Sequence, residues 1–506
     1  MDTTSDTPKS KFRVRYILFA IAAAFILLFA YMLFAAFTAK PSPKTDYALH
    51  INERTIKSLN QVDGGPTRES LPNAWPDFVK LVNDFSLAQR NFEASNTPAP
   101  PNWPEESPWP EGKLEVDLLN NPPEFAVAVK TTFARPDFAA VFDRMKSLPE
   151  MRAWRTLPSG QPLLFATLPE LLDIRELARA CAQHMSLAHR DKDNKSLVEW
   201  YERTLALARI ECSQSTLIEY LVGVAILHLA NDRAQHIIAS HTLDDATLRA
   251  LDAALVRQLG VTPKSQLTRI PPSANWIESE RTSFLDTVQW THTDDGNGDG
   301  RLLLNQLDEN VGVVPPGTTK PRIMNVAGHF VATRKQTVDL ANQIFDEAVA
   351  QSKLPLYEAR AKPDPYAQVQ QLSARFIFAK LMLPALSNAT ASEAKTQLNV
   401  SALRIAIAIE RYRLRTGNLP DTLQQLIPTE LAEIPPDPFS PQGLKYKKLD
   451  KPDALGRAYL LYTVGLDNTD NNATELQGNN RQFPITGSSE GKGYDYIIAP
   501  PEGGNR

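Results

Sequence analysis

The chain has 506 residues, which is long enough for two or three domains with hydrophobic cores of their own. Its 54 lysines and arginines nearly balance 58 aspartates and glutamates, and the small net charge of −4 gives no indication of nucleic-acid binding. Two cysteines are too few for a disulfide scaffold, and 39 prolines against 22 glycines favour ordered turns and linkers over flexible Gly-Ser spacers.

Near its start the chain contains a long apolar stretch without a charged side chain. It covers residues 16–39 and has the sequence YILFAIAAAFILLFAYMLFAAFTA. As a helix it would be about 36 Å long, enough to cross a hydrocarbon core of about 30 Å with some tilt. A cleaved signal peptide is the alternative, but its apolar core has only about 7–15 residues. The sequence therefore predicts an uncleaved transmembrane helix that contacts membrane lipid over residues 16–39.

Basic residues set the expected orientation of this helix. Four of them lie between Lys9 and Arg15, directly before the apolar stretch, whereas Lys40 and Lys44 follow it. The side of a span that is richer in lysine and arginine tends to stay in the cytoplasm. We therefore expect residues 1–15 to form a cytoplasmic tail and the body of the protein to lie outside the cytoplasm.

Residues 40–123 are interpreted as a stalk and a proline-rich linker with one helix. Residues 40–74 have a mixed polar composition, which is typical of a stalk. Residues 74–92 place apolar side chains at helical spacing and predict the helix. Residues 97–112 contain six prolines, a density that neither a helix nor a central strand tolerates, so this part is expected to be extended and semi-rigid.

Residues 124–390 are predicted to form an α-helical domain. Apolar residues recur every three or four positions along residues 174–188 and 197–212, and a polar run lies between them. This pattern predicts two antiparallel helices joined by a turn. Further helices are predicted over residues 221–230, 244–259, 273–285, 337–351 and 367–386.

Residues 391–506 change in character. An apolar stripe from Leu398 to Tyr412 is followed by Gly417, where a helix is expected to end. Strand-like runs follow at residues 444–447, 458–464 and 494–498. One helix and a short antiparallel sheet are expected here, that is, a small α+β domain at the end of a mainly α protein.

Three segments of this last region resemble the C-terminal domain of the major pseudopilins of type II secretion. They are RIAIAIERYRLRTGNLPDTLQQLIP from Arg404, IPPDPFSPQGLKYKK from Ile434 and YLLYTVGLDNTDNN from Tyr459. The residues that carry the resemblance are Tyr412, Gly417, Pro420, Leu423, Asp437, Pro438, Phe439, Gly443, Tyr446, Tyr462, Gly465 and Asp467. The whole chain resembles large membrane-anchored bacterial envelope proteins of unknown role that end in the same region.

The resemblance implies a location and a metal site. In an envelope protein of this kind the span would cross the cell inner membrane and the body would be periplasmic. The pseudopilin domain binds calcium after its Gly-x-Asp element, which implies Asp467 and Asp470 as ligands here. Two departures argue against pilus-like polymerisation. The C-terminal helix is not continuous with the span, and Asn471-Asn472 stands where the family has Gly-Gly.

A second candidate calcium site lies in the run DDGNGDG. Asp295, Asn297 and Asp299 place oxygen atoms at alternate positions before Gly300, as the first half of an EF-hand loop does. The twelfth position holds Gln306 in place of the bidentate glutamate of a complete loop. Plain turns use the same residue types and are the more common outcome, so a calcium loop and a turn both stay open.

The two cysteines suggest no metal centre. Cys181 and His184 lie one turn apart on a predicted helix, and His189 lies eight residues after Cys181. A fourth zinc ligand is not evident, and Cys181 is interpreted as a buried thiol. A disulfide between Cys181 and Cys212 stays open. Folding the two helices about their turn would place Cys181 opposite residues near 203 instead, which argues against that bond.

The sequence nominates no catalytic residue. A G-x-S-x-G match at residues 487–491 lies in a polar stretch without a following histidine, so we interpret it as a turn. The expected role is structural or partner-binding, within the cell envelope or near a secretion assembly. A hydrolase whose site is assembled from distant residues of the helical domain is the alternative. A deep pocket with converging acids, histidine or serine would favour the hydrolase.

Overall fold

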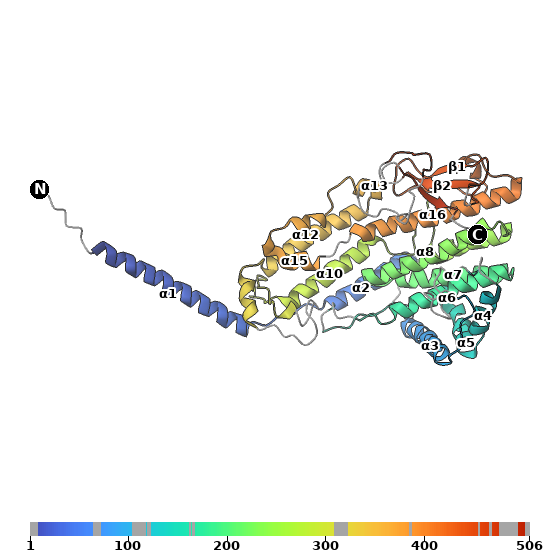
Figure 1. The fold of residues 1–506 in the computed structure, drawn as a ribbon. Helices are drawn as coiled ribbons and strands as arrows, with labels where there is room; N and C mark the ends of the chain where they lie inside the picture. Colours follow the sequence, from blue (N-terminus) through green and yellow to red (C-terminus); the bar gives the residue numbers. More distant parts are fainter. Residues whose placement is uncertain are drawn as a thin grey trace.

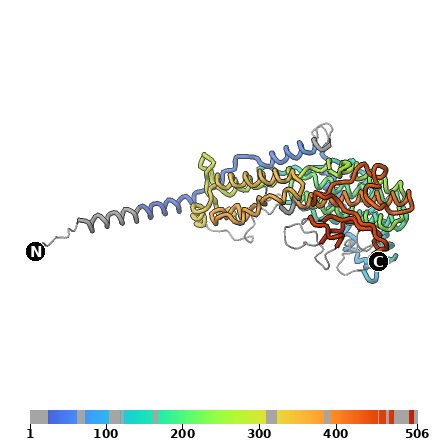
Figure 2. Tube along the Cα trace, turned by 90° about the horizontal axis from the view of Figure 1, so that it is seen from above, coloured from blue at the N-terminus to red at the C-terminus, as the bar shows by residue number. Residues whose placement is uncertain are grey.

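The computed structural model is a mainly helical protein with a small antiparallel sheet, as predicted (Figure 1). It describes residues 9–63, 72–103, 118, 123–160, 163, 167–307, 322–383, 387–453, 456–464, 468–474 and 494–500. Two views show an elongated body from one end of which a single long helix projects (Figures 1 and 2).

The projecting helix is α1 (Lys9–Thr38), and its last turns are fixed to the body. They contact the 3-10 helix η4 (Arg322–His329). Asn325 Nδ2 donates to the carbonyl oxygen of Ala36 at 3.1 Å, and Arg322 Nη1 donates to that of Phe37 at 2.9 Å. Across the residues that the structure describes, no helix combines the length and the apolarity that a membrane crossing requires.

The segment that was predicted to be a stalk is folded onto the body. It contains α2 (Tyr47–Asp63), which packs against α10 (Ser273–Thr291). The buried residues of α2 lie at helical spacing: Ala48, Ile51, Thr55 and Leu59. Ala48 and Ile51 pack with Leu157 and Leu163. The stripe is short and its neighbours in the sequence are polar, so the composition of the segment did not indicate it. The prediction of a stalk over residues 40–74 therefore differs from the structure.

The predicted antiparallel pair is present as α6 (Leu171–Arg190) and α7 (Asn194–Cys212), which pack closely. Asp193 caps α7 by accepting a hydrogen bond from Ser196 N at 3.0 Å, which fixes the turn between them. The apolar run at 221–230 lies in α8 (Leu217–Ala239), at the centre of the bundle. The other helices of the body are α3 (Trp75–Ala94), α4 (Pro123–Phe133), α5 (Pro136–Arg144), η2 (Met145–Glu150), α9 (Asp245–Leu259) and α12 (Arg334–Ser352).

Gly223 on α8 allows the closest approach of α7 and α8. A Cβ atom at this position would lie 2.6 Å from Cys212 Sγ and would also collide with the backbone nitrogen of Cys212. We therefore expect Gly223→Ala to lower the free energy of unfolding by about 1–3 kcal/mol, because the two helices must separate. Urea unfolding followed by circular dichroism tests this. Val222→Ala, at the neighbouring partly exposed position, is the control, and an equal loss in both variants would contradict the packing argument.

One segment that was predicted to be a single helix is divided into shorter pieces. Residues 367–386 were expected to form a single helix, whereas the structure has separate short pieces there. They are α14 (Ala367–Gln371), η5 (Ala374–Phe376) and α15 (Ile377–Met382), with α13 (Leu356–Ala359) before them. The interruption coincides with contacts to α12 and to the residues before it. Ala332 N, just before α12, donates to Arg375 O at 2.7 Å, and Arg375 Nη2 donates to Gln336 Oε1 on α12 at 2.6 Å. These long-range contacts hold the chain out of helical geometry.

The C-terminal helix α16 (Ser387–Thr416) belongs to both parts of the body. Val400, Leu403 and Ile407 join the core of the helical bundle. Ala402 and Ile405 join the smaller core beneath the sheet. The predicted boundary between residues 390 and 391 therefore falls inside one continuous helix, and the two parts share it.

The predicted sheet is present and small. It consists of β1 (Lys445–Lys448), β2 (Tyr459–Thr463) and β3 (Tyr496–Ala499), in the antiparallel order β1-β2-β3. The short helix η6 (Leu423–Leu426) lies between α16 and β1 in the chain. Every residue of β2 is buried because it is the central strand and packs on α16 through Leu461. The α+β assignment of the C-terminal region is thus confirmed.

Candidate functional site

A cavity of about 880 Å³ lies between the helical bundle and the C-terminal region. Its walls come from α8, α10, the loop before α10, the end of α12 with α13, α16 and the loop at residues 436–438. Pockets that bind small molecules usually measure about 300–1,000 Å³ and lie where structural units meet. Size and position therefore make this cavity the main candidate site.

Apolar side chains contribute much of the cavity walls. Aliphatic and aromatic side chains from several helices line it, among them Tyr220, Val224, Ile277 and Leu356. Six prolines contribute further: Pro271, Pro272, Pro355, Pro365, Pro436 and Pro438. Proline has no backbone N–H, so these stretches cannot donate to a ligand. These parts of the wall would therefore suit the apolar surface of a ligand.

Polar side chains also line the cavity. Tyr366 is only 8% exposed, and its buried hydroxyl has no hydrogen-bond partner among the described residues. Burial raises the pKa of that phenol. Glu393 on α16 also lines the cavity, and burial raises the pKa of its carboxyl, although hydrogen bonds with Ser273 act in the opposite direction.

The charged residues of the lining differ in how they are paired. Lys353, Arg360 and Lys362 come from the segment that joins α12 to α14. The two lysines make no ion pair within the described part of the chain. The carboxylates, in contrast, accept local bonds. Asp364 Oδ1 accepts from Tyr366 N at 2.9 Å, and Asp437 accepts from the Phe439 amide at 2.8 Å and from the Thr463 hydroxyl.

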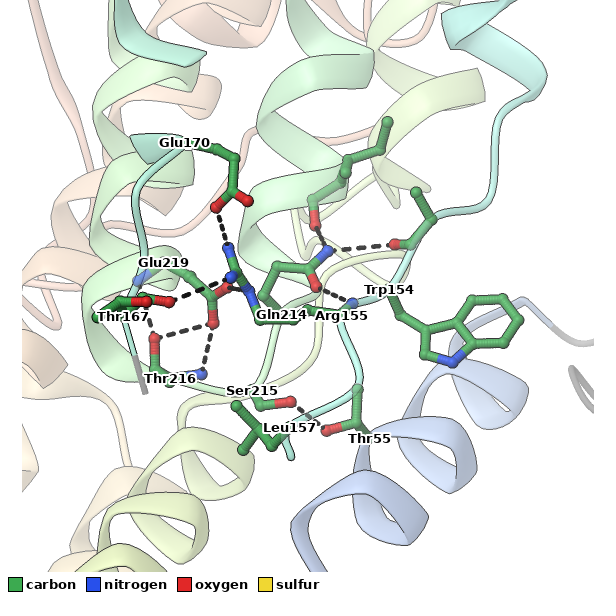
Figure 3. A network of polar contacts seen from close by, with 12 residues as sticks. Thr55, Trp154, Arg155, Leu157, Thr167, Glu170, Gln214, Ser215, Thr216 and Glu219 are labelled. Atoms are coloured by element: carbon green, nitrogen blue, oxygen red, sulfur yellow. Dashed lines mark hydrogen bonds and ion pairs between the residues drawn. The ribbon is translucent and has the colours of Figure 1, made fainter. Parts of the chain in front are cut away.

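A second polar cluster is buried where α8 begins (Figure 3). Arg155 Nε donates to Glu219 Oε1 at 2.7 Å, and its Nη2 donates to Glu170 Oε2 at 3.0 Å. The Glu219 side chain is fully buried, and its Oε2 accepts from the amide and hydroxyl of Thr216, which completes a capping box on α8. Gln214 Oε1 accepts from Arg155 N at 2.8 Å. The cluster fastens the extended segment around residue 155 to the turn between α7 and α8.

Glu211 lies close to this cluster but takes no part in its hydrogen bonds. It is fully buried, and neither carboxyl oxygen has a hydrogen-bond partner among the described residues. Burial and the nearby Glu219 carboxylate raise the pKa of Glu211 well above its usual range. Glu211 is not among the residues that line the cavity, so a bound molecule there would not reach it.

The cavity does not assemble a nucleophile with a base. Its described lining contains no histidine. Cys212 lines it, but burial raises the pKa of its thiol, and Sγ donates to the Tyr220 carbonyl oxygen at 3.8 Å. Such a thiol stays protonated and is a poor nucleophile.

The first candidate calcium loop folds as a tight turn on the surface. Asp295 Oδ1 accepts from the backbone nitrogens of Asn297 and Asp299 at 2.9 and 3.0 Å. Gly296 and Gly298 have positive φ angles of 93° and 78°, which explains the glycines. The Asp295 carboxylate thus forms the turn itself. A calcium site at Asp295, Asn297 and Asp299 remains a prediction.

The second candidate site is described in part, since Asp467 lies outside the described residues. Asp470 Oδ1 accepts from the Tyr462 hydroxyl at 3.1 Å and from Asn472 N at 2.9 Å. The neighbouring Asp495 accepts hydrogen bonds from two backbone amides of the same loop. Nothing in the sequence indicated Asp495 beside Asp470, because it lies 25 residues further along the chain. Within the described residues, no three His, Cys, Asp or Glu side chains are grouped as a metal site would need.

The cysteines behave as expected for buried thiols. Both are free and buried, and burial raises the pKa of Cys181 to about 12. Cys181 lies beside Arg203 and Thr204, as the folding of α6 on α7 predicted. His184 stacks on Trp200 with ring centroids 3.9 Å apart, so it packs in the core.

The serine motif at residues 487–491 lies outside the described residues. Comparison of the chain with protein-family models and with curated proteins, and of the fold with solved structures, gives no significant match.

Proposed function

We propose that this chain is a single-pass membrane protein with its N-terminus in the cytoplasm and its body in the periplasm. The observation that carries the proposal is the exposure of α1. The consecutive residues Phe25, Ile26, Leu27 and Leu28 are each 52–71% exposed. Consecutive helical residues point in all directions, so this part of the helix has no polar face and no protein cover. Lipid is the solvent in which such a surface is stable.

The surface around the base of α1 supports the same placement. Ile323 and Phe330, on and next to η4, are 50% and 71% exposed. Arg322 lies at the same place, and the guanidinium of Arg301 lies 5.8 Å from the ring centre of Tyr31 on α1. Exposed apolar side chains next to cations suit the boundary between lipid tails and headgroups.

The role that the geometry supports best is binding, in the cell envelope and near a secretion assembly. The cavity is large and apolar, and its described lining holds no nucleophile with a base. The resemblance of residues 404–472 to pseudopilins supports the connection with secretion. Because Lys44 bonds to Asp294 and α2 packs on α10, the body would sit close to the membrane surface and would meet partners or ligands there.

A labelling experiment tests anchor and orientation together. Both native cysteines are buried, so Leu172→Cys, at a position 62% exposed, provides a selective label site. We expect the chain to stay in the membrane pellet after an alkaline carbonate wash. We also expect Leu172→Cys to react with a membrane-impermeant maleimide while the inner membrane is intact.

Two controls accompany this experiment. Deletion of residues 16–39 should release the chain into the supernatant, and the unsubstituted protein should remain unlabelled. Recovery of the full chain in the supernatant would disprove the anchor. Labelling that requires a broken inner membrane would place the body in the cytoplasm and disprove the orientation.

A further inference from the structure

We propose that the 880 Å³ cavity binds an amphipathic anion, a molecule with one long apolar chain and a carboxylate or phosphate head. A free fatty acid and an anionic phospholipid share this chemistry. The inference names the ligand class of the binding role proposed above and does not depend on the orientation of the anchor.

The apolar chain would contact the walls that the helices provide. Val224 and Tyr220 on α8, Ile277 on α10 and Leu356 on α13 face the same space. Burial of apolar surface contributes roughly 25 cal/mol per Å², so walls of this kind favour a long chain over a compact polar ligand. The prolines of the lining argue against an extended peptide, which binds through backbone hydrogen bonds.

The head group of the ligand would give a hydrogen-bond partner to a buried polar group that has none among the described residues. The buried Tyr366 hydroxyl has no partner among the described residues and can donate to an oxygen atom. A buried polar group without a hydrogen bond carries a free-energy cost in the folded protein. An acidic head that accepts from this hydroxyl would remove that cost.

The charges of the lining favour an anion over a cation. Lys353, Arg360 and Lys362 are clustered within ten residues, and the two lysines make no ion pair in the described part of the chain. The carboxylates of Asp364 and Asp437 accept local hydrogen bonds instead. The two lysines are therefore the cations of the lining that an anionic head could pair with, whereas these two carboxylates are already held by the protein.

Photolabelling of the full-length chain in zwitterionic phosphatidylcholine nanodiscs tests the proposal. The probe is a long-chain fatty acid with a diazirine on its chain, and labelled peptides are identified by mass spectrometry. We expect labels in residues 348–366 and 393–397 in addition to α1. Excess unlabelled fatty acid should remove the cavity labels. A phosphatidate competitor shows whether the phospholipid form binds as well, and an alkyl trimethylammonium of equal length should not compete.

Charge variants test the assignment of the head group. The double variant Lys353→Glu and Lys362→Glu should reduce cavity labelling about five- to tenfold, since each exposed charge pair is worth up to about 1 kcal/mol. Lys195→Glu, at a side chain 87% exposed on α7, should leave the labelling unchanged. Ala359→Trp, which fills the cavity from α13, should abolish the cavity labels and spare those on α1.

The outcomes separate this inference from the proposed anchor. Labels confined to α1 would overturn the cavity as a lipid-anion site while leaving the anchor in place. Equal labelling in the double variant, or competition by the ammonium compound, would overturn the anionic head. A chain that fails to enter nanodiscs would contradict the anchor; binding of the probe to that chain in solution would still test the cavity.

Discussion

Replacing Arg155 by methionine is expected to lower the free energy of unfolding by about 3–5 kcal/mol. Methionine keeps much of the length of the side chain but removes both ion pairs shown in Figure 3. The Glu219 carboxylate, which is fully buried, would then lack its counter-charge, and an uncompensated buried charge carries a cost of this size. Urea unfolding of the full-length protein in detergent, followed by circular dichroism, measures the loss.

Two further variants show whether the buried charge is the cause. In the double variant Arg155→Met with Glu219→Gln, the charge is removed as well, so much of the lost stability should return. Arg144→Met breaks an exposed pair with Asp84 and should cost less than about 1 kcal/mol. If the double variant were as unstable as Arg155→Met alone, lost packing against the Trp75 ring would explain the effect instead.

The parts of the fold that could be predicted are those with local signals. The stripes of α6 and α7 repeat over four turns, and Asp193 marks the turn between them. The three strands are short but are separated by turn residues, and each was placed within two residues of its observed start. Local periodicity was enough in these cases because tertiary contacts agree with it.

The parts that could not be predicted depend on contacts between distant residues. Arg155 and Glu219 are 64 positions apart, and nothing near either residue indicates the pair. The cavity draws its lining from segments between Cys212 and Pro438. The break in the predicted helix at 367–386 follows from contacts with α12, 39 positions away. Sequence patterns report which face of an element is apolar, but not which element will cover it.

Replacing Glu211 by glutamine is expected to change how stability depends on pH. The raised pKa means that the folded protein keeps the proton at a pH where the unfolded chain, with a value near 4.5, has lost it. Folding then requires proton uptake, so Glu211 lowers stability as the pH rises above about 4.5, by up to about 1.4 kcal/mol per pH unit. Glutamine has nearly the same shape and no such proton.

The two proteins should therefore have similar stability near pH 4, and Glu211→Gln should be increasingly the more stable one toward pH 8. Urea unfolding at intervals of one pH unit gives both curves. Glu202 on the same helix is the control, because its pKa is shifted in the opposite direction. Its hydrogen bond with Arg257 lowers its pKa, so Glu202→Gln should lose stability at neutral pH and approach the unsubstituted protein in acid. Parallel curves for Glu211→Gln and the unsubstituted protein would mean that Glu211 is ionised in the folded state. The cluster around Arg155 would then have to stabilise a third carboxylate, because Arg155 is the cation among the described residues that lowers the pKa of Glu211.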